Sequence, residues 1–161
     1  MEEVSRDSKL KVLTAREARA VYAVAETMFP PNGALTTSVS DAEVLRYVDD
    51  LLASLPFKER CLIRCLFTLF EVQMVVTQPR GAKRFSKASL EARTRSLAQW
   101  DKSPLHMQRV AFQALRSLIL WAYVDHPVVA KEFGMEPGSA VIARRNIKAA
   151  MSANAVSNAA K

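Results

Sequence analysis

Helix-start signals recur along this chain, and no stretch of useful length shows the alternation typical of a half-buried strand. The first signal is Thr14 followed by Glu17, a capping-box pattern in which each side chain bonds the other residue's backbone. Apolar residues then recur at helical spacing up to Phe29, before the turn sequence Pro30–Gly33. With only 4 glycines in 161 residues, few positions favour a break in a helix. We therefore predict an all-α fold.

A second helix is predicted from Ser40, which repeats the capping-box pattern with Glu43. Its apolar residues form one narrow stripe, which is typical of a surface helix with a single buried side. The stripe consists of Val44, Val48, Leu51, Leu52 and Leu55. Arg46, Asp49 and Asp50 are predicted to face solvent. Because Asp49 and Asp50 are adjacent, they point to different sides of a helix and are unlike a catalytic carboxylate pair.

The third helix is predicted to begin near Pro56 and is apolar on almost every side. Its one polar stripe consists of Arg60, Arg64, Thr68 and Glu71. We predict that this helix is central to the fold, with Cys61 and Cys65 as buried structural thiols. Glu71 is expected to pair with a neighbour on the polar stripe, either Arg64 or Thr68. A zinc site needs about four ligands, and no second Cys or His pair lies nearby, so no metal site is predicted.

A polar break at residues 78–87 separates these helices from the rest of the chain. Ser89 is predicted to cap a fourth helix, whose apolar anchors are Leu90, Leu97 and Trp100. Ser103 and Pro104 then resemble a cap followed by a first-turn proline, which predicts the start of a fifth helix.

The fifth helix is predicted to run to about Val124 and to change character along its length. Its first half has a polar stripe of Arg109, Gln113 and Arg116, whereas residues 118–124 are apolar all round. This second half is either core or a contact surface for a partner. A short helix from Pro127, closed by Gly134, completes a compact bundle of about five to six helices within residues 1–138. The basic, alanine-rich tail at 139–161 is either helical or disordered.

Groups that could carry catalysis are few and scattered. His106 and His126 are the only histidines, and each lies near a predicted helix end, where a surface or structural role is expected. No Ser-His-Asp or Cys-His arrangement follows from the spacing, and the few glycines form no phosphate-binding loop. We therefore predict no catalytic, cofactor-binding or metal-binding residue in this chain.

The net charge of +7 is unevenly distributed. Residues 78–95 carry +5 and residues 139–161 carry +4, which leaves the remaining chain near −2. One alternative is an all-helical nucleic-acid-binding domain that uses this basic loop and tail. The sequence lacks the short helix pair with a basic recognition helix that would favour it, so nucleic acid is not the expected partner. A stand-alone helical enzyme is a second alternative.

The first twelve residues, MEEVSRDSKLKV, contain neither the apolar core of a signal peptide nor a twin-arginine signal. The longest apolar runs are too short to span a bilayer, so no membrane span is predicted. Two cysteines without a disulfide framework agree with a reducing compartment. The sequence as given predicts a cytoplasmic protein. The alternatives are a leader that has been removed, or export to the periplasm together with a partner.

Three stretches resemble the gluconate 2-dehydrogenase subunit 3 family. Two of them are RFSKASLEARTRSLAQWDKSP, at residues 84–104, and RVAFQALRSLILWAYVDHPVV, at residues 109–129. The third, LTAREARAVYAVAETMFPP at residues 13–31, is similar to the family's first helix. Together the matches cover roughly residues 13–134. The positions that match in order are Phe85, Ser89, Trp100, Ser103, Arg109, Phe112, Leu115, Tyr123 and Pro127.

This resemblance implies an all-helical small, or gamma, subunit that contains no flavin of its own. Its partner would be a large oxidoreductase of the glucose–methanol–choline type, which holds FAD and oxidises a sugar or an alcohol. The small subunit would support the folding, stability or export of that partner, although many members begin with a twin-arginine signal that this sequence lacks. The residues expected to contact the partner, or to shape the docking surface, are Arg84, Phe85, Trp100, Arg109, Trp121, Tyr123, Arg144 and Arg145.

Overall fold

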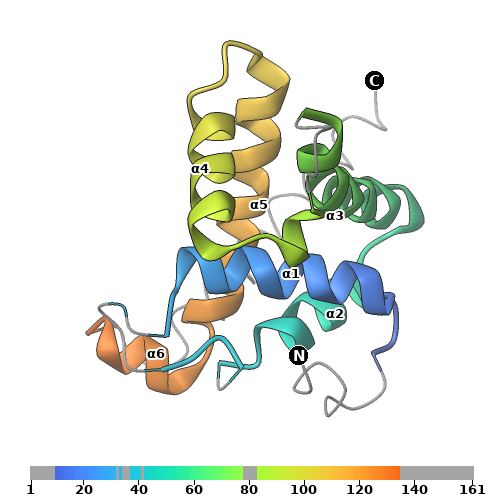
Figure 1. The fold of residues 1–161 in the computed structure, drawn as a ribbon. Helices are drawn as coiled ribbons and strands as arrows, with labels where there is room; N and C mark the ends of the chain where they lie inside the picture. The colour runs from blue at the N-terminus through green and yellow to red at the C-terminus, as the bar shows by residue number, and fades with distance from the viewer. Residues whose placement is uncertain (1–9, 32, 34–36, 41, 78–82, 135–161) are drawn as a thin grey trace.

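The computed structural model describes residues 10–31, 33, 37–40, 42–77 and 83–134. These residues form helices and turns without a strand, which confirms the predicted all-α class (Figure 1). The predicted tail at 139–161 lies outside the described residues. The elements are α1 (Ala15–Met28), α2 (Val44–Ser54), α3 (Phe57–Thr77), the 3-10 turn η2 (Phe85–Lys87), α4 (Leu90–Asp101), α5 (His106–Val124) and α6 (Pro127–Glu132).

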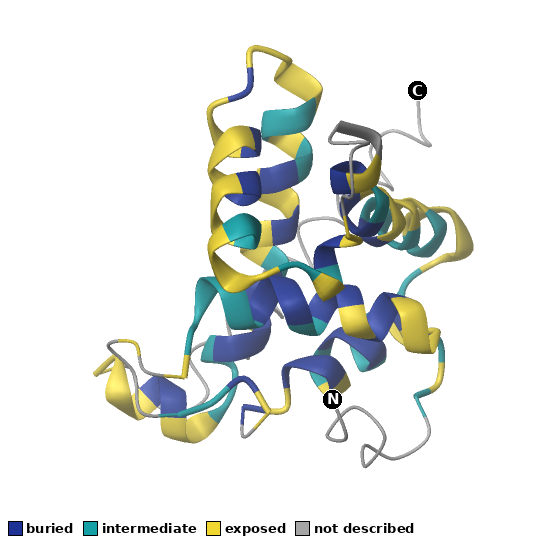
Figure 2. Ribbon diagram, viewed as in Figure 1, coloured by how far each residue is buried: buried dark blue, intermediate teal, exposed yellow. Residues whose placement is uncertain are grey.

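Helix α1 packs against α2, α3, η2, α4 and α5, whereas α6 packs on α5 (Figure 1). Small side chains dominate the buried side of α1, so that several neighbours can approach its backbone closely. These buried residues include Ala18, Ala20, Val21, Ala23, Val24 and Ala25. Figure 2 shows the buried positions running along α1 through the middle of the fold, with exposed positions on the outer side of α4 and on α6.

The predicted capping box at the start of α1 is confirmed. The Thr14 hydroxyl accepts the Glu17 backbone N–H at 3.3 Å, and the Glu17 carboxylate accepts the Thr14 N–H at 2.8 Å. Ser89 likewise caps α4, since its hydroxyl accepts the Ala92 N–H at 3.3 Å. Gly134 follows α6 with a φ of +68°, in the left-handed region that favours glycine after a helix. These local signals were sufficient to locate three helix ends.

The capping box predicted at Ser40 is wrong. Helix α2 begins only at Val44, after Glu43, whose φ of 49° is left-handed and whose side chain makes no capping bond. Instead, the Ser40 hydroxyl lies 2.9 Å from that of Ser38, and the Ser40 carbonyl accepts the Glu43 N–H at 3.1 Å. A turn therefore occupies the place of the predicted first helical turn.

Asp49 was predicted to face solvent, but its side chain is buried. Its carboxylate accepts three backbone N–H groups, from Lys11 at 2.6 Å, Val12 at 3.0 Å and Leu13 at 2.8 Å. Asp50 does lie at the surface, where it forms a 2.6 Å ion pair with the Lys11 ammonium group. Asp49 thus holds the segment that leads into α1 against α2.

The prediction that α3 is buried on most sides is also wrong. Phe67, Phe70 and Met74 enter the core, whereas Leu62 is 73% exposed and Leu69 is 47% exposed. Cys65 is exposed and Cys61 is partly exposed, so neither is the buried structural thiol that was predicted. Helix α3 lies at the edge of the fold (Figure 1), where the described elements cover only one of its sides.

The fifth helix begins two residues later than predicted, at His106. Ser103 instead stabilises the turn between α4 and α5, because its hydroxyl accepts the Leu105 N–H at 3.1 Å. The Arg109 guanidinium donates to the carbonyls of Ser103 at 2.6 Å and Pro104 at 3.2 Å. Pro104 therefore belongs to a turn that links two helices packed side by side (Figure 1).

Candidate functional site

Three of the residues assigned from sequence to a partner surface lie in the core instead. Phe85, Trp100 and Tyr123 are all buried. The Trp100 ring packs on Phe70 with ring centroids 4.3 Å apart, and the Tyr123 ring stacks on Phe29 at 4.1 Å. These side chains stabilise the fold, so their assignment to direct partner contact is corrected, whereas the prediction that Trp100 anchors the fourth helix is confirmed.

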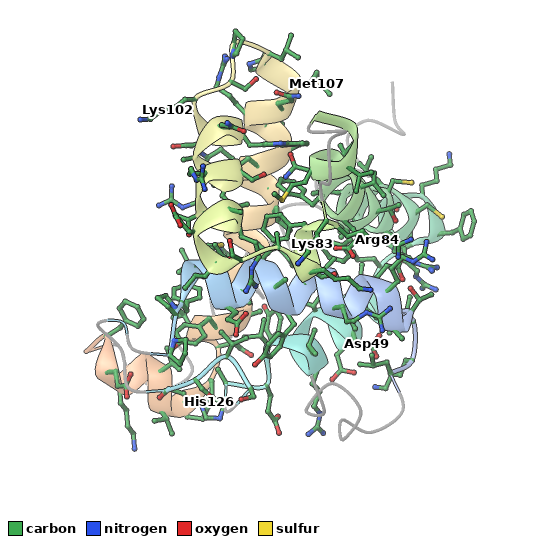
Figure 3. All side chains as sticks on the ribbon, in the orientation of Figure 1. Asp49, Lys83, Arg84, Lys102, Met107 and His126 are labelled. Carbon is green, nitrogen blue, oxygen red and sulfur yellow. The ribbon has the colours of Figure 1, made fainter. Side chains whose placement is uncertain are left out.

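The remaining predicted contact residues do not form one site. Arg84 is exposed, and Figure 3 shows it with Lys83 near the place where α1, α3 and η2 meet. Arg109 and Trp121 lie at opposite ends of α5, about 18 Å apart along the helix axis. Trp121 is 37% exposed. Two further predicted residues, Arg144 and Arg145, lie outside the described residues.

Buried polar groups link α3 to α4 and η2. The Trp100 indole N–H donates to the Gln73 amide oxygen, and the Gln73 amide nitrogen donates to the Ser96 hydroxyl at 2.7 Å. The Glu71 carboxylate accepts from the Ser86 backbone N–H at 3.1 Å and hydroxyl at 2.6 Å. Sequence reasoning expected Glu71 to pair along its own stripe. The observed partner is on another element, which no spacing within α3 could indicate.

Arg64 instead joins α3 to α1 through Glu17. Its Nε donates to one Glu17 carboxylate oxygen at 2.8 Å, and its Nη2 donates to the other at 3.2 Å. Burial by itself would raise the pKa of Glu17, but the hydrogen bonds from Arg64 and Thr14 outweigh it and lower that pKa below 4.5. Glu17 therefore caps α1 and anchors α3 with the same carboxylate.

We expect Glu17→Gln to lower the free energy of unfolding by about 1–3 kcal/mol at pH 7. Glutamine preserves the capping-box pattern, so the change mainly removes the charge that Arg64 binds. Since the Glu17 pKa is lower in the folded state, this stabilisation is present above pH 4.5 and is lost as the pH falls through the lowered pKa. Urea unfolding at pH 7 and pH 3 measures the difference.

The matched control is Glu91→Gln, which removes an exposed ion pair with Arg95. Its effect should stay small at both pH values. If the difference between wild type and Glu17→Gln were as large at pH 3 as at pH 7, the charge of Glu17 would not be the cause.

An exposed apolar stripe on α3 is the feature that sequence reasoning missed. Leu62, Cys65, Leu69 and Val72 follow one another at intervals of three, four and three residues, which places them on one side of the helix. We call these four residues the outer face of α3. Leu62, Cys65 and Leu69 are exposed and Val72 is partly exposed. The sequence contains this apolar stripe, but the whole helix was predicted to be central to the fold.

Exposed basic residues lie beside this helix. Lys83 and Arg84 are exposed and lead into η2, which packs against both α1 and α3 (Figure 3). We call Lys83 and Arg84 the basic border.

A cavity of about 250 Å³ lies between α2 and the junction of α5 with α6. Arg46, Asp50, Asp125 and His126 are among its lining residues. Within the described part of the chain, no group of three or more His, Cys, Asp or Glu side chains could hold a metal ion. Nor is any helix there long and apolar enough to cross a bilayer.

Comparison with known proteins identifies the family. A model of the gluconate 2-dehydrogenase subunit 3 family matches residues 15–137, a range that contains every helix described above. Searches of curated proteins and of solved structures returned no match. The family match overlaps the resemblance seen at residues 13–134, and it extends over more than half of the chain. This chain therefore belongs to the gluconate 2-dehydrogenase subunit 3 family.

Proposed function

We propose that this chain is a non-catalytic subunit of a flavin-dependent sugar or alcohol dehydrogenase complex. Its role would be to support the folding and stability of the large subunit, which would hold the FAD. The observation that carries the proposal is the family match over residues 15–137, because the family is named for the third subunit of a dehydrogenase. An accessory subunit also explains why the sequence offers no convergent set of catalytic groups.

The contacts of the buried acidic side chains support a structural role for this chain. Glu17, Asp49 and Glu71 are buried, and each carboxylate binds groups on another segment of the chain. They connect α1 to α3, the segment before α1 to α2, and α3 to η2. Carboxylates that hold segments of the chain together stabilise a defined shape. A subunit that supports the folding of a partner requires such a shape.

The test is to express a large glucose–methanol–choline-type oxidoreductase from the same genome with and without this chain. We expect the two proteins to co-purify, and the soluble, flavin-loaded large subunit to fall several-fold when the chain is omitted. Stability differences of 1–2 kcal/mol are enough to change abundance to that extent in cells. Flavin absorbance, soluble yield and dye-linked oxidation of sugars and alcohols are the readouts.

Unchanged yield, flavin content and activity without the chain, together with no co-purification, would refute the accessory role. The nucleic-acid alternative predicts a different result. In that case the purified chain would bind duplex DNA with an affinity that falls steeply between 50 and 200 mM salt.

A further inference from the structure

We infer that the outer face of α3, together with the basic border, is the surface through which this chain binds the catalytic subunit. The matching surface on that subunit is an apolar helix or ridge with acidic residues along its edge. This inference rests on the proposed function. It goes further by naming the contact surface and the chemistry of the surface that it binds.

The spacing of the outer face suits a helical partner. Apolar residues at alternating intervals of three and four form the seam along which two helices pack together. Leu62 and Leu69, which lie seven residues apart on this seam, are 73% and 47% exposed. Contiguous exposed apolar residues bordered by charge are typical of a protein-binding site.

The opposite side of α3 holds this seam rigidly in place. Phe67, Phe70 and Met74 are buried in the core, and the hydrogen bonds of Glu71 and Gln73 fix the helix to η2 and α4. A surface that is already ordered before binding loses little conformational entropy on association. The outer face is therefore presented in a form that is ready to bind.

Charge decides between the occupants that could cover this face. The basic border would attract an acidic edge and would accelerate encounter with it. A second copy of this chain would bring two positive borders toward each other, which disfavours self-association through this face. A nucleic acid would require cations along the middle of the surface, where the outer face is apolar.

The experiment is a competition during co-expression. The large subunit is produced with equal amounts of wild-type chain and a differently tagged variant, and the ratio of the two in the purified complex is measured. Leu62→Ser combined with Leu69→Ser should reduce incorporation about 100-fold, the scale expected for losing two buried leucine contacts. Lys83→Glu combined with Arg84→Glu should also reduce incorporation, and this reduction should diminish in high salt.

The matched control is Val128→Ser combined with Phe133→Ser. These residues are 51% and 46% exposed and lie in or next to α6, which Figure 1 shows at the opposite end of the fold from α3. The control should be incorporated like wild type. Because all four apolar side chains are exposed, both double variants should unfold at the wild-type temperature when purified alone.

The outcomes separate the two proposals. Equal incorporation of the α3 variant and wild type would overturn the assignment of this face and leave the accessory role standing. If the wild-type chain formed no complex at all, the proposed function would fail and this inference with it. If the free chain were a dimer that the α3 substitutions converted to a monomer without affecting incorporation, the face would bind a second copy, and the inference would be overturned.

Discussion

Replacing Trp100 with alanine should lower the free energy of unfolding by about 3–5 kcal/mol. Trp100 is 6% exposed, packs on Phe70 and donates its indole N–H to Gln73. The substitution would leave a cavity between α3 and α4 and would deprive the buried Gln73 amide of a donor. Since a domain has only about 5–15 kcal/mol of stability in total, we expect a large fall in the unfolding temperature.

The second tryptophan is the natural control. Trp121 is 37% exposed, so Trp121→Ala should cost much less stability than Trp100→Ala. Denaturant unfolding followed by circular dichroism compares the two variants without relying on tryptophan fluorescence. Equal losses of stability in the two variants would show that the packing of Trp100 against α3 contributes no more to stability than the contacts of Trp121.

Asp49→Ala should cost about 2–3 kcal/mol, the scale expected for removing a buried charged acceptor from donors that are buried or partly buried. Three consecutive backbone N–H groups, those of Lys11, Val12 and Leu13, would lose their acceptor. Because these residues lead into α1, their amide hydrogen exchange should accelerate more than exchange in α5. Unfolding measurements together with hydrogen exchange test both parts of the prediction.

Asp50→Ala is the adjacent control for this variant. Asp50 forms an exposed ion pair with Lys11, a type of interaction that contributes about 0–1 kcal/mol. The two substitutions remove the same chemical group from neighbouring positions. Similar stability losses at both positions would show that the three backbone bonds to Asp49 are not important for the fold.

Some parts of the fold could be predicted because the signal and its effect lie close together in the sequence. The Thr14–Glu17 capping box and the Ser89 cap each involve residues three apart, so their geometry depends little on the rest of the chain. The same pattern failed at Ser40, where a turn forms instead. The burial of Asp49 could not be predicted, because its partners lie 36–38 residues earlier in the chain.

The candidate site was harder to predict for a physical reason. Hydrophobicity identifies side chains that avoid water, but it does not say whether they do so inside one chain or against another. Phe85 and Tyr123 were therefore assigned to a partner surface although they are buried. Helix α3 was predicted to be central to the fold, although its Leu62 and Leu69 are exposed. Whether an apolar side chain is buried in its own chain depends on how its helix packs in the fold, and α3 packs at the edge of the fold.

The position of α1 has a consequence for how the protein is made. This helix leaves the ribosome before the other described helices, yet the elements against which it packs follow over the next 96 residues, up to Val124 at the end of α5. At typical translation rates this interval lasts about 5–20 s. During that time the apolar side of α1 lacks most of its neighbours, so the nascent chain is open to chaperones and to aggregation. Folding must therefore be completed late, and a shortened chain that ends before α5 would leave its first helix without its full set of packing contacts.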